Sequence, residues 1–412
     1  MTDTSLVAAE PAASGIGEFP MPRAAGCPFD PPPGLRVLQV EAPLTRVRLW
    51  DGSTPWLVTR YADQRALLAD PRISADPSDP HFPHRGAGQR ALLRQDRSFI
   101  VMDDPEHARL RRMVTATFAI KRVEALLPAI QTIVDGLIDD MLAGPTPVDL
   151  VSAFALPVPS LVICELLGVR YADHDFFQAN TRILVNDKST PEQLKLASQR
   201  LIDYLEGLVR EKLTDPGEDV LSQLAGRVNA GEISLRQAAA IGRLLLGAGH
   251  ETTANMIALG TLALLEHPEQ LAQLREADDP KQIAAAVEEL LRFLTIAQSG
   301  RRRVAREDIE IGGQTIRAGE GVILPNDIAN RDGTTFSEPD RLDLQRDARG
   351  HVAFGFGVHQ CLGQPLARVE LRVVYGTLYR RIPTLRLAVE FDEIPFKHDA
   401  AVYGVYELPV TW

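Results

Sequence analysis

One long apolar stretch constrains the fold of this chain more than any other part of it. The stretch reads SLRQAAAIGRLLLGAGHETTANMIALGTLALLEHPE and begins at Ser234. Ser234 and Gln237 form a capping box and His267-Pro268 marks a stop, so roughly thirty residues, or about 50 Å, can form one helix. A helix of that length crosses a whole domain. Because it is apolar nearly all round, it must be buried.

The middle of this predicted helix, AGHETT, consists of residues that are unfavourable in the interior of a packed helix. Glycine weakens a helix interior, and a threonine hydroxyl can bond back to the carbonyl of the preceding turn, so we expect a local opening of the hydrogen-bond ladder. The alternative is a small-residue crossing point against another helix. A zinc-protease motif is excluded, because H-E-x-x-H requires a histidine where Ala254 stands.

Composition limits the size class and the partners. At 412 residues the chain exceeds the usual size of a single core, which leaves either several domains or one unusually large fold. The net charge of -11 argues against nucleic acid as the main partner. The chain has three cysteines, Cys27, Cys164 and Cys361, and they lie far apart in the sequence. An odd number of distant cysteines is typical of a protein in a reducing cytosol rather than of a disulfide framework. No C-x-x-C pair supports a zinc site.

No stretch of the sequence predicts a membrane anchor. The N-terminus is a polar, proline-rich leader without a basic start before an apolar core. The most apolar later run, FALPVPSLVICELLGV, is interrupted by Pro157, Pro159 and Glu165 and is too short to span a bilayer. We therefore expect a soluble, cytoplasmic protein.

Periodicity elsewhere predicts mostly helices with a few hairpins. Apolar residues at three- and four-residue spacing in ALLPAIQTIVDGLIDDML and QRLIDYLEGLVREKL are typical of amphipathic helices. LWDGSTPWLVTR is typical of two strands around a turn, and DIEIGGQTIRAGEGVILP of a hairpin on Gly312-Gly313 followed by a further strand. The predicted fold class is mainly α with small β-sheets.

A glycine-rich loop, FGFGVHQCLG, holds the thiol of Cys361. The loop lacks the third glycine of the phosphate-binding pattern G-x-G-x-x-G. An inert buried cysteine is one interpretation. The other is a thiolate, because Gly355, Gly357 and Gly363 allow close approach of the backbone, loop amides can point at the sulfur, and the helix that should follow adds its positive end. A single thiolate ligand on a buried haem iron fits this arrangement.

At these residues the sequence resembles the cytochrome P450 family. The family's cysteine-loop pattern, F-x-x-G-x-H/R-x-C-x-G, is met by Phe354, Gly357, His359, Cys361 and Gly363. Its central-helix pattern, A/G-G-x-D/E-T-T, is met by Ala248, Gly249, Glu251, Thr252 and Thr253. Its E-x-x-R pattern is met by Glu289 and Arg292, and Arg341 resembles the partner arginine of the family's meander.

The resemblance covers residues 20–412 as a single domain behind a polar, flexible leader, residues 1–19. It implies the P450 fold, with a long central helix and a cysteine-ligand loop over haem b, in which Cys361 is the axial thiolate and Phe354 and Gly363 belong to the haem-binding loop. The positions that match the family's propionate-binding positions are His107, Arg111, Arg303 and His359.

By the same resemblance, Ala248 leaves room above the haem for dioxygen and substrate. Thr252 supplies the hydroxyl that organises proton delivery to dioxygen, and Glu251 is the acid that replenishes the protons. The implied activity is a haem-thiolate monooxygenase that inserts one oxygen atom from O2 into a hydrophobic small molecule by hydroxylation or epoxidation. A peroxygenase and a haem-thiolate sensor or carrier are the rival classes, and Glu251 and Thr252 argue against both.

Partners are implied by the resemblance as well. The chain looks like the soluble bacterial group that acts on macrolides, statin-type polyketides, secosteroids and xenobiotics. Because no flavin domain or nucleotide-binding motif is present, electrons would come from NAD(P)H through a separate ferredoxin and ferredoxin reductase. We expect a monomer that docks the ferredoxin near the cysteine loop, guided by Arg109, Arg112 and Arg368.

The substrate pocket, by family position, draws on residues 82–100, 176–195, Leu245, Ala248, 296–297 and 402–403. The first of these segments carries several basic residues that could face either a carboxylate or solvent. We expect solvent for Arg85, Arg90, Arg94 and Arg97.

Overall fold

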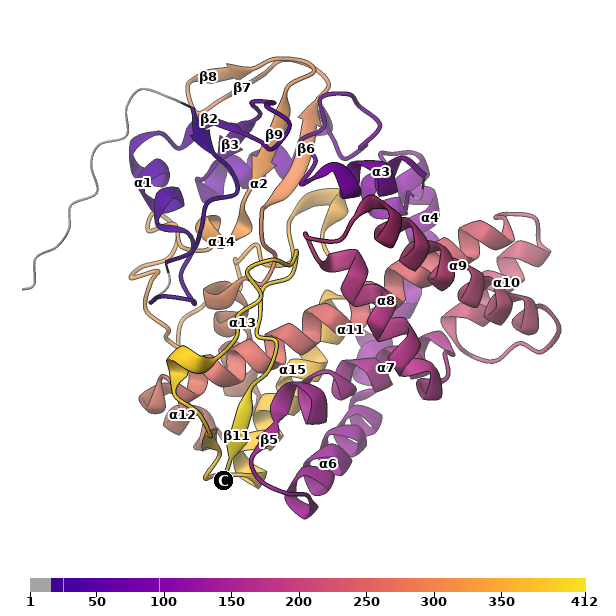
Figure 1. The fold of residues 1–412 in the computed structure, drawn as a ribbon, viewed down its shortest axis with the longest axis vertical. Helices are drawn as coiled ribbons and strands as arrows, with labels where there is room; N and C mark the ends of the chain where they lie inside the picture. The colour runs from indigo at the N-terminus through magenta and orange to yellow at the C-terminus, as the bar shows by residue number, and fades with distance from the viewer. Residues whose placement is uncertain (1–15, 25, 96) are drawn as a thin grey trace, which may run out of the picture.

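The predicted central helix is α11, Leu235–Leu265, in a computed structural model that describes residues 16–24, 26–95 and 97–412. Figure 1 shows α11 crossing the middle of the molecule. The predicted capping box is confirmed, because the Gln237 amide donates to Ser234 Oγ at 3.1 Å and the Ser234 amide donates to Gln237 Oε1 at 2.9 Å. Helices α7, α9, α10, α13 and α15 contact α11, so its apolar sides are buried as predicted.

The other helices surround α11. Their bounds are α1 Pro33–Glu41, α2 Tyr61–Ala69, α3 Ala87–Gln95, α4 Glu106–Thr115, α5 Ile120–Glu124, α6 Leu127–Ala143, α7 Pro157–Leu167, α8 His174–Val185, α9 Pro191–Thr214, α10 Val220–Asn229, α12 Pro268–Arg275, α13 Pro280–Leu294, α14 Asn326–Ala329 and α15 Gln364–Arg381. Helices α6 and α9 confirm the two amphipathic helices that the periodicity predicts. The fold is mainly helical with small sheets, as expected.

The strands of the described residues form three small sheets, and the largest lies at the top of the view in Figure 1. Its strand order is β1-β2-β3-β9-β6-β4, the second sheet is β10-β11-β5, and β7-β8 form a hairpin. The bounds are β1 Gly17–Glu18, β2 Leu44–Arg48, β3 Trp56–Val58, β4 Ile73–Ser74, β5 Val148–Asp149, β6 Arg301–Ala305, β7 Ile309–Ile311, β8 Gln314–Ile316, β9 Gly321–Leu324, β10 Arg386–Leu387 and β11 Pro409–Thr411.

Both predicted hairpins are present, although the first strand of one of them, β2, ends at Arg48, just before the stretch that predicts it. Strands β2 and β3 pair antiparallel, and β7 pairs with β8 around Gly312 and Gly313. These two glycines have φ angles of 58° and 77°, which residues with a Cβ rarely adopt, so the turn requires glycine at both places. The further strand predicted after this hairpin is β9, which lies between β3 and β6.

The predicted opening of α11 at AGHETT is wrong, because the helix is continuous through this segment. The Thr252 hydroxyl does donate back to the carbonyl of Ala248, at 2.8 Å, and Asn255 Nδ2 donates to the carbonyl of Glu251 at 2.7 Å. A carbonyl oxygen has two lone pairs, so these side chains bond to the helix without displacing its own hydrogen bonds.

The alternative interpretation of AGHETT, a small-residue crossing point, is confirmed at Gly249. A Cβ at this position would lie 2.6 Å from Ile163 Cγ1, and Ile163 belongs to α7. The two helices therefore approach one another more closely than an alanine would permit. The segment combines this packing constraint with the polar side chains of Glu251 and Thr252.

A buried ion pair on α13 fixes the segment that precedes the cysteine loop. Arg292 Nε donates to Glu289 Oε2 at 2.7 Å, and both side chains are fully buried. The prediction that Arg341 is their partner arginine is wrong. Arg346 occupies that place, with Nε 3.2 Å from Glu289 Oε1, because the turn from Asp343 to Arg346 directs this side chain back towards α13.

Arg341 contributes only its carbonyl oxygen to this cluster, while its exposed side chain lies 3.3 Å from Glu338. We therefore expect Arg346→Ala to lower the free energy of unfolding by about 1.5–3 kcal/mol, since it removes a largely buried charged hydrogen bond to Glu289 Oε1. Arg341→Ala should cost less than about 1 kcal/mol, because exposed ion pairs contribute little. Denaturant unfolding of both variants measures the difference, and equal losses would contradict the assignment of Arg346.

The N-terminal boundary lies a little before the predicted one. Gly17 and Glu18 form β1 on the edge of the large sheet, and Phe19 is buried in a cluster with Leu35 and Leu57. The fold therefore includes residues 17–19 of the predicted leader, and residues 1–15 lie outside the described part of the chain. Among the described helices, none combines the length and the hydropathy needed to cross a membrane.

Candidate active site

The cysteine loop is a tight turn that directly precedes α15 and that only a glycine-rich sequence can form. The Cys361 amide donates to the carbonyl of Phe354 at 2.9 Å, which closes the loop. Gly355 and Gly357 both have φ angles of 73°. A Cβ on Gly357 would lie 2.1 Å from the carbonyl oxygen of Leu68 on α2, so this glycine permits close contact with the protein itself.

The Cys361 thiol lies at the entrance to α15, as predicted. Burial raises its pKa, but the backbone amide of Gly363 and the guanidinium groups of Arg301 and Arg111 act in the opposite direction. These are the groups that stabilise a sulfur anion. A metal ion deprotonates a coordinating thiol outright, so this sulfur is prepared to serve as a thiolate ligand.

The four predicted propionate-binding residues converge from α4, β6 and the cysteine loop. The rings of His107 and His359 lie 4.2 Å apart between centroids. Arg111 Nη2 donates to the carbonyl of Gln360, next to His359, at 2.7 Å. Burial, followed by the positive charge of Arg303, lowers the pKa of His359 to about 3. One cluster of basic groups therefore surrounds the residues beside the cysteine.

Two ring nitrogens in this cluster lack partners. His107 Nε2 and His359 Nδ1 are buried, and neither has a hydrogen-bond partner in the described part of the chain. His107 Nδ1 lies 3.0 Å from Asp104 Oδ1, a contact that orients the ring. A buried polar atom without a partner is costly, so the two nitrogens are suited to bind carboxylate oxygens from outside the protein.

Arg301 belongs to the same site and was missed in the sequence. On β6 the alternation of side chains places Arg301 and Arg303 on one face of the sheet and Arg302 on the other. Burial lowers the pKa of Arg301, and the charge of Cys361 offsets part of this effect. The period of two in the strand RRRVA is the signal that could have identified it.

These residues fit a haem. A single thiol suits the iron, and the basic cluster with its unpaired nitrogens suits the two propionates of the ring. Within the described ranges, no three His, Cys, Asp or Glu side chains come together in a way that could hold a metal ion alone.

The middle of α11 turns a polar face outward from the packed core. Ala248 is exposed and Thr252 is partly exposed, although most residues along this part of the helix are buried. Because the Thr252 hydroxyl proton is donated to Ala248, the hydroxyl oxygen is left able to accept a hydrogen bond. The predicted small residue and the predicted hydroxyl lie one turn apart, on the same side of the helix.

Glu251 is held by a lysine that the sequence did not indicate. Lys397 Nζ lies 3.2 Å from Glu251 Oε1, and Asn255 Nδ2 donates to the same oxygen at 3.1 Å. Burial favours a raised pKa for Glu251, but the positive charge of Lys397, followed by the interaction with His250 and the hydrogen bonds from Asn255 and Lys397, outweighs it, and the pKa is lowered. The carboxylate is therefore ionised although it is buried. No local motif links Lys397 to α11, so the sequence carries no signal for this contact.

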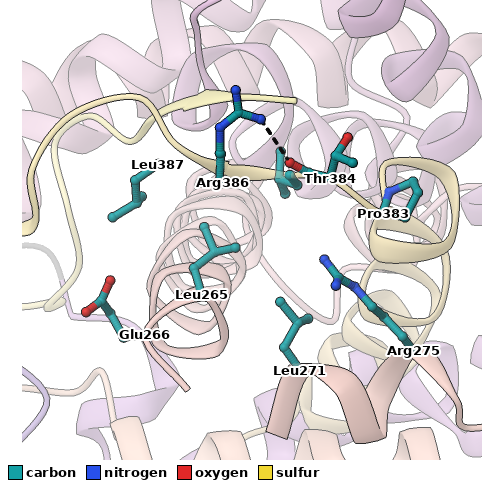
Figure 2. Close-up of a pocket in the computed structure, with 9 residues that line it drawn as sticks. Leu265, Glu266, Leu271, Arg275, Pro383, Thr384, Arg386 and Leu387 are labelled. Carbon is teal, nitrogen blue, oxygen red and sulfur yellow. Dashed lines mark hydrogen bonds between the residues drawn. The ribbon is translucent and has the colours of Figure 1, made fainter. Parts of the chain in front are cut away.

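Two surface pockets of the described chain have linings that include neither Ala248 nor Thr252. A pocket of about 280 Å³ next to the cysteine loop is lined by Asp104, His107, Ala108, Arg111, Arg112, Thr115 and Val358. Figure 2 shows another, of about 390 Å³, where Leu265 and Leu271 meet the segment from Pro383 to Leu387. None of the residues that line the larger pocket belongs to the motifs described above, so we do not assign the active site to it.

The family model for cytochrome P450 matches residues 46–383. Cytochrome P450 GfsF of Streptomyces halstedii is 60% identical over 100% of both chains, and its crystal structure has a TM-score of 0.90 with 96% of this chain and 100% of that chain covered. Pentalenic acid synthase of Streptomyces avermitilis is 50% identical, with 98% of this chain and 100% of the relative covered.

A further solved structure shows a relative with its ligand. The mycinamicin VIII C21 methyl hydroxylase of Micromonospora griseorubida, bound to mycinamicin VIII, is 42% identical with a TM-score of 0.90, and the match covers 96% of this chain and 100% of that chain. Identity of this degree along nearly the whole chain, together with the cysteine loop and the polar face of α11, leaves one conclusion. The chain belongs to the cytochrome P450 family and is a haem-thiolate monooxygenase of hydrophobic small molecules.

Proposed function

We propose specific roles for the residues of this monooxygenase. Cys361 would supply the thiolate ligand of the haem iron, and Phe354 and Gly363 shape the loop that presents it. The haem propionates are held by His107, Arg111, Arg303 and His359, with Arg301 as a further cation. The convergence of these basic groups beside Cys361 supports this assignment. When bound, the haem supplies dioxygen activation, which the electron donation of a thiolate ligand promotes.

Glu251 and Thr252 are the proposed catalytic residues. Thr252 offers a hydroxyl oxygen on the exposed side of α11, where it can hold a water or a protonated reactant in place. Glu251, ionised beside Lys397, can take up protons from solvent and pass them on through water. Ala248, one turn before Thr252, keeps this side of the helix free of bulky side chains. This pairing of acid and hydroxyl is the observation that carries the proposal.

The electrons are proposed to come from NAD(P)H through a ferredoxin reductase and a ferredoxin. The test is a reconstitution in which NADPH oxidation and product formation are measured with hydrophobic candidate substrates. We expect NADPH oxidation to depend on both redox proteins and to rise when a substrate is added. Product formation driven by hydrogen peroxide alone, with no response to the ferredoxin, would contradict this electron source and indicate a peroxygenase.

The proposed ferredoxin surface surrounds the pocket beside the cysteine loop, and the ion pairs of the other two predicted arginines support Arg112 as its main cation. Arg368 makes two hydrogen bonds to Glu288, at 2.6 and 2.9 Å, and Arg109 is paired with Glu106 at 2.7 Å. Arg112 is exposed on the last turn of α4, and the described part of the chain gives it no acidic partner. Val358, 60% exposed, lines the same pocket and adds an apolar contact.

We expect Arg112→Glu to slow reduction by an acidic ferredoxin about tenfold at low salt, because local potential controls the rate of encounter. Raising the salt concentration should reduce the difference between wild type and variant. Arg109→Glu is the matched charge reversal and should slow reduction less, since the Arg109 side chain is held in an ion pair with Glu106. Stopped-flow reduction measures both, and identical rates for Arg112→Glu and wild type would exclude this docking surface.

We also propose that the protein is cytoplasmic and monomeric and that it forms one domain from β1 to the C-terminus. Cys27, Cys164 and Cys361 are all free thiols, which suits a reducing compartment. Analytical ultracentrifugation of the haem-loaded protein tests the oligomeric state directly. Sedimentation as a dimer at micromolar concentration would contradict the monomer.

A further inference from the structure

Three segments that are distant in the sequence meet where the substrate pocket is expected. The loop between α8 and α9 is joined to the C-terminal turn, residues 396–405, since the Asp187 amide donates to the carbonyl of Asp399 at 2.8 Å. Ala297 and Val402 form a β-bridge, which ties that turn to the segment before β6. Helix α3 packs beside α9, as Figure 1 shows. The loop that leads into α3 is the third of these segments.

Two guanidinium groups are buried within this junction. Arg85, on the loop before α3, is only 18% exposed, so the expectation that it faces solvent is wrong. Arg302, on β6, is 6% exposed and donates through Nη1 to the carbonyl of Pro83 at 2.7 Å. Pro83 and Arg85 are two residues apart, so the same short loop brings both cations together. The side chain of Arg94 lies outside the described residues, whereas Arg97 is exposed and paired with Asp76.

This junction contains two arginine cations and one acid, so positive charge is in excess. The acid that acts on both arginines is Asp187, whose carboxylate oxygen is 3.5 Å from Arg85 Nη1 and whose side chain is 40% exposed. Burial, followed by the like charge of Arg85, lowers the pKa of Arg302 to about 9. Two buried cations that share one partly hydrated acid are unfavourable unless a further anion joins them.

Two buried N–H groups without a hydrogen-bond partner indicate where such an anion can bind. Arg85 Nε and Arg302 Nε are both buried, and neither has a hydrogen-bond partner in the described ranges. A guanidinium group binds a carboxylate through two parallel hydrogen bonds, a geometry that an ammonium group cannot offer. An incoming carboxylate would also compete with Asp187 for Arg85.

We propose that Arg85 and Arg302 form a carboxylate-binding subsite at the entrance to the substrate pocket, so that the substrates include apolar molecules that carry a carboxylate at one end. This inference rests on the proposed function. Because Arg302 lies on the opposite face of β6 from Arg301 and Arg303, the strand separates the subsite from the haem side. The carboxylate therefore lies far from the oxidised carbon, with an apolar chain between them.

The test compares dodecanoate with dodecanol, which share a chain length and differ in charge. Binding to the haem-loaded protein is measured by calorimetry and by the haem absorption shift. We expect Arg302→Gln and Arg85→Gln to weaken dodecanoate binding about tenfold or more and to leave dodecanol binding unchanged. Asp187→Asn, which removes the competing acid and no buried cation, should tighten dodecanoate binding. Arg97→Gln is the matched control and should alter neither affinity.

Equal effects on the acid and the alcohol, or no effect of Asp187→Asn, would overturn the subsite. If acetate competes as well as dodecanoate, the junction is a general anion site and the claim about substrates fails. The proposed function is tested separately by the ferredoxin-dependent oxidation of a neutral substrate. Persistence of that activity together with unaltered dodecanoate binding in both arginine variants would refute the subsite alone.

Discussion

Replacing Cys361 with histidine is expected to abolish monooxygenase turnover while haem is still bound. Imidazole can ligate iron, but it donates less electron density than a thiolate, and that donation favours cleavage of the O–O bond. The basic groups that converge on the propionates are unchanged in this variant, so retention of the haem should depend on them. The absorption spectrum of the reduced carbon monoxide adduct distinguishes a thiolate ligand from an imidazole ligand.

The remaining cysteines provide the controls. Cys27 is exposed and Cys164 is buried on α7, where burial raises the pKa of its thiol to about 12. Neither lies in the cysteine loop, so Cys27→Ser and Cys164→Ser should retain the thiolate-type spectrum and the activity. A thiolate-type spectrum in Cys361→His would assign the iron ligand to another residue.

The second large effect concerns the polar face of α11. Thr252→Val preserves the shape of the side chain and removes the hydroxyl. We expect substrate binding and NADPH oxidation to continue, while most of the reduced oxygen is released as hydrogen peroxide because proton delivery is impaired. Glu251→Gln removes the acid instead, and since acid–base groups contribute about 10²–10⁴-fold to rates, it should slow overall turnover by about 10²-fold.

The ratio of product to NADPH oxidised, measured with peroxide release, separates these two outcomes. A threonine that serves only the crossing of α11 with α7 would give full coupling in Thr252→Val, apart from a modest change in stability. Gly249, which makes that crossing, gives the structural comparison: Gly249→Ala should lower stability without raising the peroxide yield per NADPH. Full coupling in Thr252→Val would leave AGHETT with its packing role only.

Local patterns in the sequence predicted the parts of the fold that local chemistry determines. The capping box of Ser234 fixes the start of α11, and the paired glycines Gly312 and Gly313 fix a hairpin. The cysteine loop was identified because the glycines that its turn requires lie within a few residues of Cys361. In each case the interacting groups are near neighbours along the chain, so the sequence shows both partners at once.

Contacts between distant segments were predicted less well. Arg341 was chosen over Arg346 as the partner of Glu289, because the sequence shows that an arginine is near but not which way the intervening turn directs it. Arg85 was assigned to solvent, since the loop from α8 that buries it lies about a hundred residues later. Lys397 could not be paired with Glu251 at all, because 146 residues separate them.

The C-terminal turn places Lys397 against Glu251 and, a few residues later, Tyr403 against Ile296, with the Tyr403 amide donating to the Ile296 carbonyl at 2.7 Å. Under the proposed roles, one short peptide thus shapes the cavity for the substrate and sets the acidity of the proton donor. Variants selected in this turn for a new substrate should therefore lose turnover rate as a side effect. To alter selectivity without that trade-off, substitutions should begin at Pro83 and Arg85, which contact Arg302 and Asp187.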